Sequence, residues 1–178
     1  MNTLTITEDP VDQKLNKTIT NVINHVRENP EAKDVTFSVD SILERGFRSE
    51  IKVRDFNFIV DEPHSLGGEN EAPNPVEYVL GALASCQEIV IKAYAGQLGI
   101  KLNSIRVEAS GDLDLAGFFN ISNERPGFNQ VRYSTVISTD ERDLEKLQLL
   151  KDFSSSRCPV LDIIANPVPV TGDVVFTN

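Results

Sequence analysis

The fold is decided by residues 73–99, which read PNPVEYVLGALASCQEIVIKAYAGQLG. Apolar residues recur there at three- and four-residue spacing, which predicts one long helix. The stripe that they form consists of Val76, Val79, Leu80, Leu83, Cys86, Val90, Ile91 and Tyr94. Pro75 suits the first turn of this helix, and we expect the helix to end before Gly99. The small residues from Gly81 to Ser85 let other elements approach closely, so the pattern indicates a central buried helix.

Before this helix the hydrophobic period changes to two, the period of strands. Between Asp34 and Asp61 apolar residues alternate with polar ones in three runs. The runs are Val35, Phe37 and Val39, then Ile51 and Val53, then Phe56, Phe58 and Val60. They predict an antiparallel meander of three strands. The Gly- and Pro-containing residues 62–75 predict a loop that leads into the central helix.

Residues 1–33 form a separate N-terminal helical extension in this interpretation. From Asp12 to Glu28 one apolar stripe follows helical spacing, and Asn29-Pro30 ends it. The stripe consists of Leu15, Ile19, Val22, Ile23 and Val26. His25, in the same segment, is expected to be a surface residue.

After the central helix the pattern predicts two strands, two helices and a last strand. These elements are residues 105–110 and 131–137 as strands, a helix through Leu144, Leu147, Leu150 and Phe153, a short helix at 160–165, and a strand at 168–176. Asp140 is expected to cap the first of these helices. Runs of strands and helices in this order predict a single α+β domain over residues 34–178 rather than a doubly wound sheet.

Composition and charge exclude several classes of protein. The 178 residues carry 17 Lys and Arg against 27 Asp and Glu, a net charge of −10 that argues against a nucleic-acid partner. No apolar run approaches the roughly 18 residues of a membrane span, so no membrane association is expected. The N-terminal residues show no secretory signal, so we expect a cytoplasmic protein. His25 and His64 lie far from each other and from both cysteines, so we expect no metal and no cofactor.

The two cysteines, Cys86 and Cys158, lie in different settings. Cys86 belongs to the apolar stripe, where a thiol is most often a packed core group. Cys158 lies between Arg157 and Pro159 at the start of a predicted helix, where the helix dipole favours a thiolate. Two such cysteines can reduce a peroxide: a thiolate takes one oxygen and becomes a sulfenic acid, and the second thiol then closes a disulfide. A cation held by a carboxylate would assist this reaction.

Two segments resemble the motifs of the OsmC/Ohr family, the osmotically inducible and organic hydroperoxide resistance proteins. The first runs from Pro73 to Cys86, and the second is Arg157-Cys158-Pro159-Val160. The resemblance covers approximately residues 34–178. Three further pieces are more similar to the broader OsmC-like branch, namely Asp61-Glu-Pro63, Gly67-Gly68 and Arg125-Pro-Gly-Phe128.

The resemblance implies an OsmC-like fold, an intertwined homodimer with long central helices packed between antiparallel sheets. It implies a cysteine-based peroxidase that reduces organic (alkyl or fatty) hydroperoxides with a thiol or lipoyl reductant. Cys86 would then be the peroxidatic thiol and Cys158 the resolving thiol. An arginine from the early strand region would assist them. Arg45, which lies beside Gly46 at a predicted turn, is preferred to the alternative, Arg48.

The family also uses a glutamate ten residues before the first cysteine. In this chain that position is Val76, and Glu77 lies nine residues before Cys86. Nine residues of helix turn by about 900°, which places Glu77 on the face opposite Cys86. Glu77 is therefore a candidate site residue if the helix begins irregularly or if Glu77 acts from the other subunit. Otherwise it is a first-turn carboxylate.

Two other functions stay open at the level of sequence. One is a non-enzymatic OsmC-like dimer that binds a small apolar ligand or a partner protein, and the other is a thiol redox sensor. The position of the sulfurs separates catalysis from passive packing. Sulfurs within a few ångström of each other, beside an arginine and open to a pocket, favour catalysis, whereas widely separated and sealed sulfurs argue against it.

Overall fold

The predicted central helix is present as α2 (Pro75–Leu98) in a computed structural model of the chain, which describes residues 9–177. Asn74 caps its start, and Gly99 ends it in the left-handed conformation, with a φ of 69° that favours glycine. The N–H of Gly99 donates to carbonyls of the last turn. Both boundaries agree with the prediction from Pro75 and Gly99.

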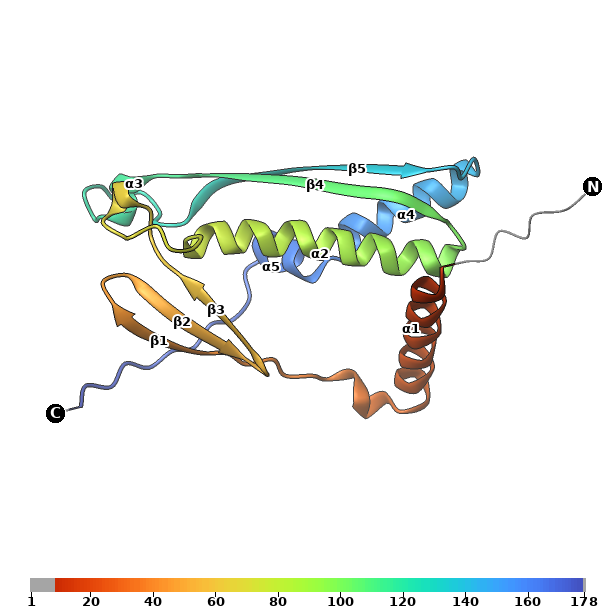
Figure 1. Cartoon of the computed structure of the whole chain (residues 1–178), viewed down its shortest axis with the longest axis horizontal. Coiled ribbons are helices and arrows are strands. Elements are labelled where there is room, and N and C mark those ends of the chain that lie inside the picture. The colour runs from red at the N-terminus through yellow and green to blue at the C-terminus, as the bar shows by residue number, and fades with distance from the viewer. Residues whose placement is uncertain (1–8, 178) are drawn as a thin grey trace, which may run out of the picture.

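The strands form two antiparallel sheets, of which the two-stranded one runs along α2 (Figure 1). The first has three strands, β1 (Asp40–Arg45), β2 (Arg48–Val53) and β3 (Phe56–Val60). The second has two long strands, β4 (Leu102–Leu113) and β5 (Phe128–Thr139). The meander and the later strand pair are therefore confirmed as elements.

The first strand lies later in the chain than predicted. Alternation at residues 35–39 predicted a strand there, but β1 begins at Asp40. The register explains the difference, since a turn at Gly46 pairs Arg45 with Arg48 and Asp40 with Lys52. Residues 35–39 therefore lie at and beyond the end of β2, where no partner strand continues the ladder.

The helices outside the centre are α1 (Pro10–Glu28), α3 (Leu115–Phe118), α4 (Leu144–Ser156) and α5 (Pro159–Ala165), with short 3-10 turns η1 (Pro30–Lys33) and η2 (His64–Leu66). The cap of α4 is Asp143, so the prediction of Asp140 is wrong. The Asp143 carboxylate accepts from the backbone N–H groups of Glu145 and Lys146. Asp140 instead follows the end of β5 and belongs to the turn before the helix.

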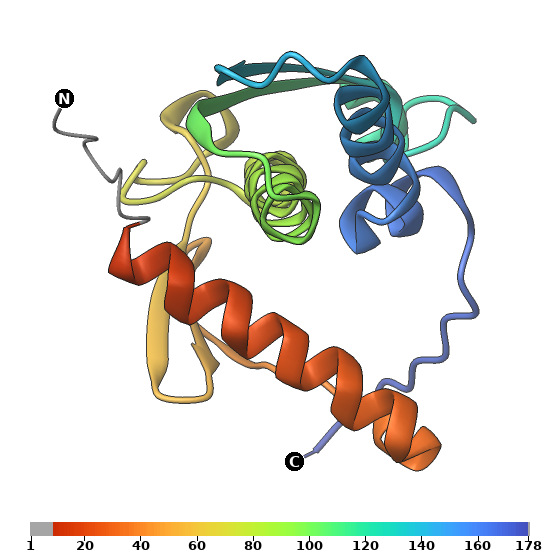
Figure 2. The ribbon, with the colours of Figure 1, turned by 90° about the vertical axis from the view of Figure 1, so that its right-hand side faces the viewer.

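The elements form layers around α2. Viewed along α2, the β4–β5 sheet covers one side, α4 and α5 lie beside it, and α1 crosses another side (Figure 2). Two core clusters fill the space between these layers. One contains Ile91, Ala95, Ile100 and Leu150, and the other contains Leu83, Val90 and Cys158. In the single chain another side of α2 stays open to solvent, where Ile89 is 68% exposed.

The C-terminal segment does not form the predicted strand. Residues 167–177 have no regular secondary structure. Val170 and Phe176 in this segment are strongly exposed. A strand needs a neighbour to hydrogen-bond with, and within residues 9–177 none pairs with this segment. Alternating apolar residues alone therefore did not produce a strand here.

The N-terminal helix α1 is confirmed and packs against the C-terminal half of α2. Asp12 pairs with Lys92 at 2.8 Å, and the end of the Asn16 side chain lies so close to Gly96 that it would have to move to admit a Cβ there. His25 is exposed, as expected. None of the helices in the described part of the chain is long and apolar enough to cross a membrane.

Candidate redox site

The structure brings the two cysteines together. The sulfur of Cys158 lies 3.2 Å from the sulfur of Cys86 in hydrogen-bonding geometry, although 72 residues separate them. Both are free thiols. A disulfide needs an S–S distance of about 2.05 Å, so a movement of roughly 1 Å would join them.

Different elements deliver the two sulfurs to this point. Cys86 projects from the middle of α2, and Cys158 lies at the junction of α4 and α5, where it caps α5. Pro159 begins α5, and the N–H of Leu161 donates to the sulfur of Cys158 at 3.4 Å. Leu150 buries α4 against α2, which carries the junction toward Cys86.

The two thiols differ in their access to solvent. Cys158 is only 2% exposed, whereas Cys86 is half-buried. Burial raises the pKa of the Cys86 thiol, the backbone of Val160 lowers it by a hydrogen bond, and the neighbouring Cys158 raises it again. In the single chain Cys86 is therefore held as a neutral thiol, and its reactive thiolate needs a cation.

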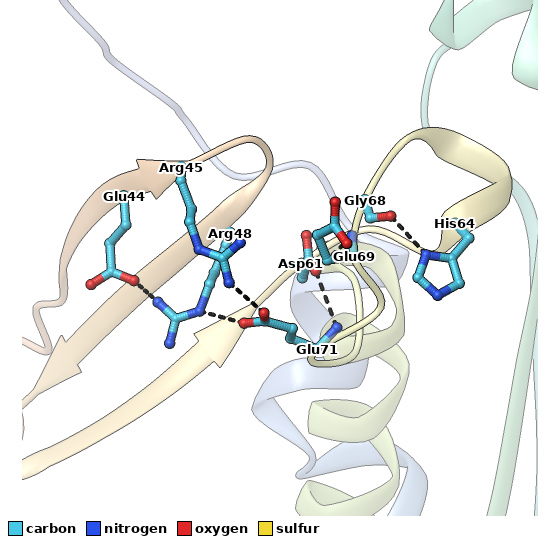
Figure 3. Close-up of polar contacts among 8 residues, drawn as sticks. All are labelled: Glu44, Arg45, Arg48, Asp61, His64, Gly68, Glu69 and Glu71. Atoms are coloured by element: carbon cyan, nitrogen blue, oxygen red, sulfur yellow. Dashed lines mark hydrogen bonds and ion pairs between the residues drawn. The ribbon is translucent and has the colours of Figure 1, made fainter.

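Both candidate arginines meet one carboxylate, that of Glu71 (Figure 3). The Arg45 Nη2 lies 2.5 Å from Glu71 Oε1, and the Arg48 Nε lies 2.7 Å from Glu71 Oε2. Arg48 also pairs with Glu44. The side chain of Arg48 is 21% exposed and that of Arg45 is 63% exposed. Arg48 is thus enclosed by two carboxylates, whereas Arg45 keeps a solvent-facing side.

Glu77 has a structural task at the start of α2. Its Oε2 accepts from the backbone N–H of Asn74 at 2.8 Å, and the Asn74 side chain accepts from the N–H of Glu77 at 2.9 Å. This reciprocal pair is a capping box. The structure therefore shows the first-turn carboxylate and places Glu71, not Glu77, beside the arginines of the same chain. Contact of Glu77 with a second subunit stays a prediction.

Sequence reasoning missed Glu71, which lies in the loop between β3 and α2. Its residue type and its place in a polar loop resemble those of many surface glutamates. Only the three-dimensional structure distinguishes Glu71 from other surface glutamates, because the β1–β2 turn brings two arginines to its carboxylate. Among residues 9–177, no hydrogen bond or ion pair joins these arginines to either sulfur.

Two hollows of about 800 and 710 Å³ lie against α1, and neither is lined by a cysteine. The second is mostly apolar and includes Ile19 of α1, Ile89 of α2 and Ile105 of β4. In the part of the chain that the structure describes, no group of three or more His, Cys, Asp or Glu residues could hold a metal ion.

Residues 68–172 match the family model described as OsmC-like protein. The crystal structure of the OsmC-like protein from Mycoplasma pneumoniae matches with a TM-score of 0.63 at 17% identity, over 75% of this chain and 90% of that one. An organic hydroperoxide resistance protein from Elizabethkingia anophelis gives 0.57 at 20% identity, over 76% and 92%. The organic hydroperoxide resistance protein OsmC from Legionella pneumophila gives 0.53 at 19%, over 73% and 89%. No curated protein matches the sequence significantly. At these identities the structural likeness shows a shared α+β fold.

Proposed function

Because this chain belongs to the OsmC-like family, we propose that it is a thiol-dependent peroxidase that reduces organic hydroperoxides through a Cys86–Cys158 disulfide cycle. The observation that carries the proposal is the 3.2 Å separation of the two sulfurs. Solved structures with this fold include proteins named for organic hydroperoxide resistance. The more accessible thiol, Cys86, is the one that meets the peroxide, and the buried Cys158 resolves the product.

The cycle has three balanced steps. The Cys86 thiolate attacks one oxygen of ROOH, the O–O bond breaks, and with one proton the products are a Cys86 sulfenic acid and the alcohol ROH. The Cys158 thiol then attacks the sulfenic sulfur, which forms the disulfide and releases water. A dithiol or lipoyl reductant donates two electrons and two protons and restores both thiols.

The surroundings of the sulfurs favour an apolar substrate. Leu83, Val90 and Cys158 form one buried cluster, and Cys86 packs against it. An alkyl or fatty chain would lose little by entering such surroundings, whereas hydrogen peroxide would exchange its water hydrogen bonds for few partners. We therefore expect alkyl hydroperoxides to react faster than hydrogen peroxide.

A homodimer is part of the proposal. The single chain leaves large apolar side chains uncovered on the β1–β3 sheet, on α2 and on the C-terminal segment, including Ile42, Phe56, Ile89, Val170 and Phe176. Such extensive apolar surface marks an interface. A second copy that covers it would pack the central helices between sheets of both subunits and bring Arg45 to a Cys86 thiolate.

The test is peroxide consumption by the purified, reduced protein. We expect turnover of cumene hydroperoxide with dithiothreitol or dihydrolipoamide, and loss of that turnover in Cys86→Ser. Ser155→Ala, an exposed change near Cys158, is the matched control and should keep full activity. Undiminished turnover in Cys86→Ser would sink the proposal. Stoichiometric disulfide formation without turnover would instead identify a redox sensor.

A further inference from the structure

The loop between β3 and α2 is organised by a buried carboxylate, Asp61. This side chain is 1% exposed and directly follows β3. Its Oδ2 accepts from the backbone N–H groups of Glu69 and Glu71, each at 3.1 Å. Its own N–H donates to the carbonyl of Pro73 at 3.4 Å. Asp61 therefore ties three points of one loop together, and Figure 3 shows its contacts with Glu69 and Glu71.

Other contacts make this loop closely packed. The ring of His64 is hydrogen-bonded to the carbonyl of Gly68 at 3.0 Å. The backbone of Gly68 lies so close to the carbonyl of Glu62 that a side chain there would overlap it. The Asp61-Glu-Pro63 and Gly67-Gly68 pieces of the sequence thus belong to one built loop. The loop presents Glu71 in a fixed position.

Glu71 in turn fixes the positions of the two arginines. Its backbone N–H is held by Asp61, and its two carboxylate oxygens each receive one arginine, Arg45 or Arg48. A carboxylate that bridges two guanidinium groups with both oxygens fixes their direction as well as their distance. The place of Arg45 is thereby linked to Asp61 through a single intervening residue.

The charge of Asp61 also acts on Arg45 directly. The second oxygen, Oδ1, is buried without a hydrogen-bond partner in the described part of the chain. The backbone hydrogen bond from Glu71 lowers the pKa of Asp61 most, burial opposes it, the backbone of Glu62 and Glu69 lowers it further, and the charge of Arg45 adds the smallest lowering. Asp61 is therefore ionised at neutral pH, and its negative charge attracts Arg45.

We propose that Asp61 is a positioning residue, which holds Glu71 and through it the Arg45–Arg48 pair in the place from which Arg45 stabilises the peroxidatic thiolate. The last part of this proposal rests on the proposed peroxidase function. The first part concerns only the folded chain. The two parts can therefore be tested separately.

The structural part is tested by NMR on the Arg48 Nε–H, which donates to Glu71 in the wild-type protein. Loss of a charged hydrogen bond corresponds to an exchange rate about ten- to a hundredfold faster. We expect this increase in Asp61→Ala and in Glu71→Ala. Asp55→Asn, which removes an exposed carboxylate from the turn before β3, is the matched control and should leave the exchange rate unchanged.

Asp61→Asn separates geometry from charge and guards against misfolding of Asp61→Ala. Its amide oxygen can still accept from Glu69 and Glu71, but its charge is gone. We expect the Arg48 Nε–H to exchange about threefold faster than in wild type, less than in Asp61→Ala. A folded Asp61→Ala protein with wild-type exchange would overturn the positioning role, and wild-type exchange in Asp61→Asn would overturn the contribution of the charge. An equal change in Asp55→Asn would overturn the positioning role as well.

The functional part is tested by single-turnover oxidation of Cys86 with cumene hydroperoxide. We expect Asp61→Ala to slow this oxidation about tenfold or more in the wild-type background and less than about twofold in an Arg45→Met background. Equal slowing in both backgrounds would show that Asp61 acts independently of Arg45 and would contradict the proposal. If wild-type Cys86 does not react at all, the peroxidase proposal fails, and the NMR result still decides the role of Asp61.

Discussion

The cysteines and the arginines of this protein are held in different ways. Cys86 and Cys158 meet inside one chain, in a core built from α2, α4 and α5. Arg45 and Arg48 meet at Glu71, at the edge of a sheet whose apolar side chains are largely exposed. The two thiols of the proposed site thus meet in a single copy, whereas its arginines pair with Glu71 and do not contact either sulfur in the described part of the chain. From this difference we infer that assembly, rather than folding of one chain, completes the site.

The largest expected effect concerns the Cys86–Cys158 pair. Cys158→Ser should leave the first oxidation of Cys86 nearly unchanged but slow the second step about a thousandfold. The reason is that a fixed neighbouring thiol acts at an effective concentration far above that of millimolar external thiol. Rapid-quench mass spectrometry of Cys86 should show sulfenic acid and then overoxidised products. A wild-type rate of disulfide formation with external thiol would show that the 3.2 Å pair is incidental.

The core around the thiols should be sensitive to truncation. Leu83 is fully buried beside Cys158, so Leu83→Ala should lower the free energy of unfolding by about 2–5 kcal/mol. Leu144→Ala, at a position that is 78% exposed, is the matched control and should change it by less than about 0.5 kcal/mol. Urea denaturation measures both values. Similar losses in the two variants would contradict a core centred on the cysteine cluster.

The proposed dimer is tested by a substitution on the exposed apolar surface that should weaken self-association. Ile89→Glu places a charge on the uncovered side of α2 and should weaken self-association by at least about thirtyfold, since a central interface side chain contributes about 2 kcal/mol or more. Analytical ultracentrifugation over a concentration series measures this change. Leu144→Glu, also at an exposed leucine but on α4, should associate like wild type. A monomeric wild-type protein would remove the need for a second copy.

The smallest expected effect is a difference between the monomer and the dimer in how the alkylation rate of Cys86 depends on pH. In the single chain, burial raises the pKa of Cys86, so its alkylation by iodoacetamide should rise with pH only above the range of an ordinary cysteine. The folded state then favours the neutral thiol, and the free energy of unfolding should fall as the pH rises from the unfolded pKa toward the folded one. In the dimer, Arg45 should move the profile to lower pH. Identical profiles for wild type and the Ile89→Glu monomer would show that the second copy adds no cation.

Local patterns predicted much of the fold. The apolar stripe, Pro75 and Gly99 sufficed for α2, because periodicity, first-turn proline and terminal glycine act within one or two turns of chain. The same patterns misplaced β1 and predicted a strand at residues 168–176. A strand depends on its neighbour, and the pattern at residues 35–39 could not show where β2 would end. Asp140 was predicted as the cap of α4, but β5 ends at Thr139 and the helix begins at Leu144, so the cap is Asp143.

By itself the sequence determined which reactive side chains are present, namely two cysteines and two early arginines. It also determined the family, since the match over residues 68–172 confirms the resemblance. It could not determine which of these groups meet. Three contacts join residues that lie apart in the sequence. They are the contact between Cys86 and Cys158, the ion pairs of both arginines with Glu71, and the hydrogen bond from the Glu71 N–H to Asp61. Such contacts are set by the packing of helices and loops, which no short stretch of sequence contains. Tertiary structure therefore decided that Glu71 holds the arginines, whereas the cap that Glu77 forms with Asn74 is a contact within one turn of chain.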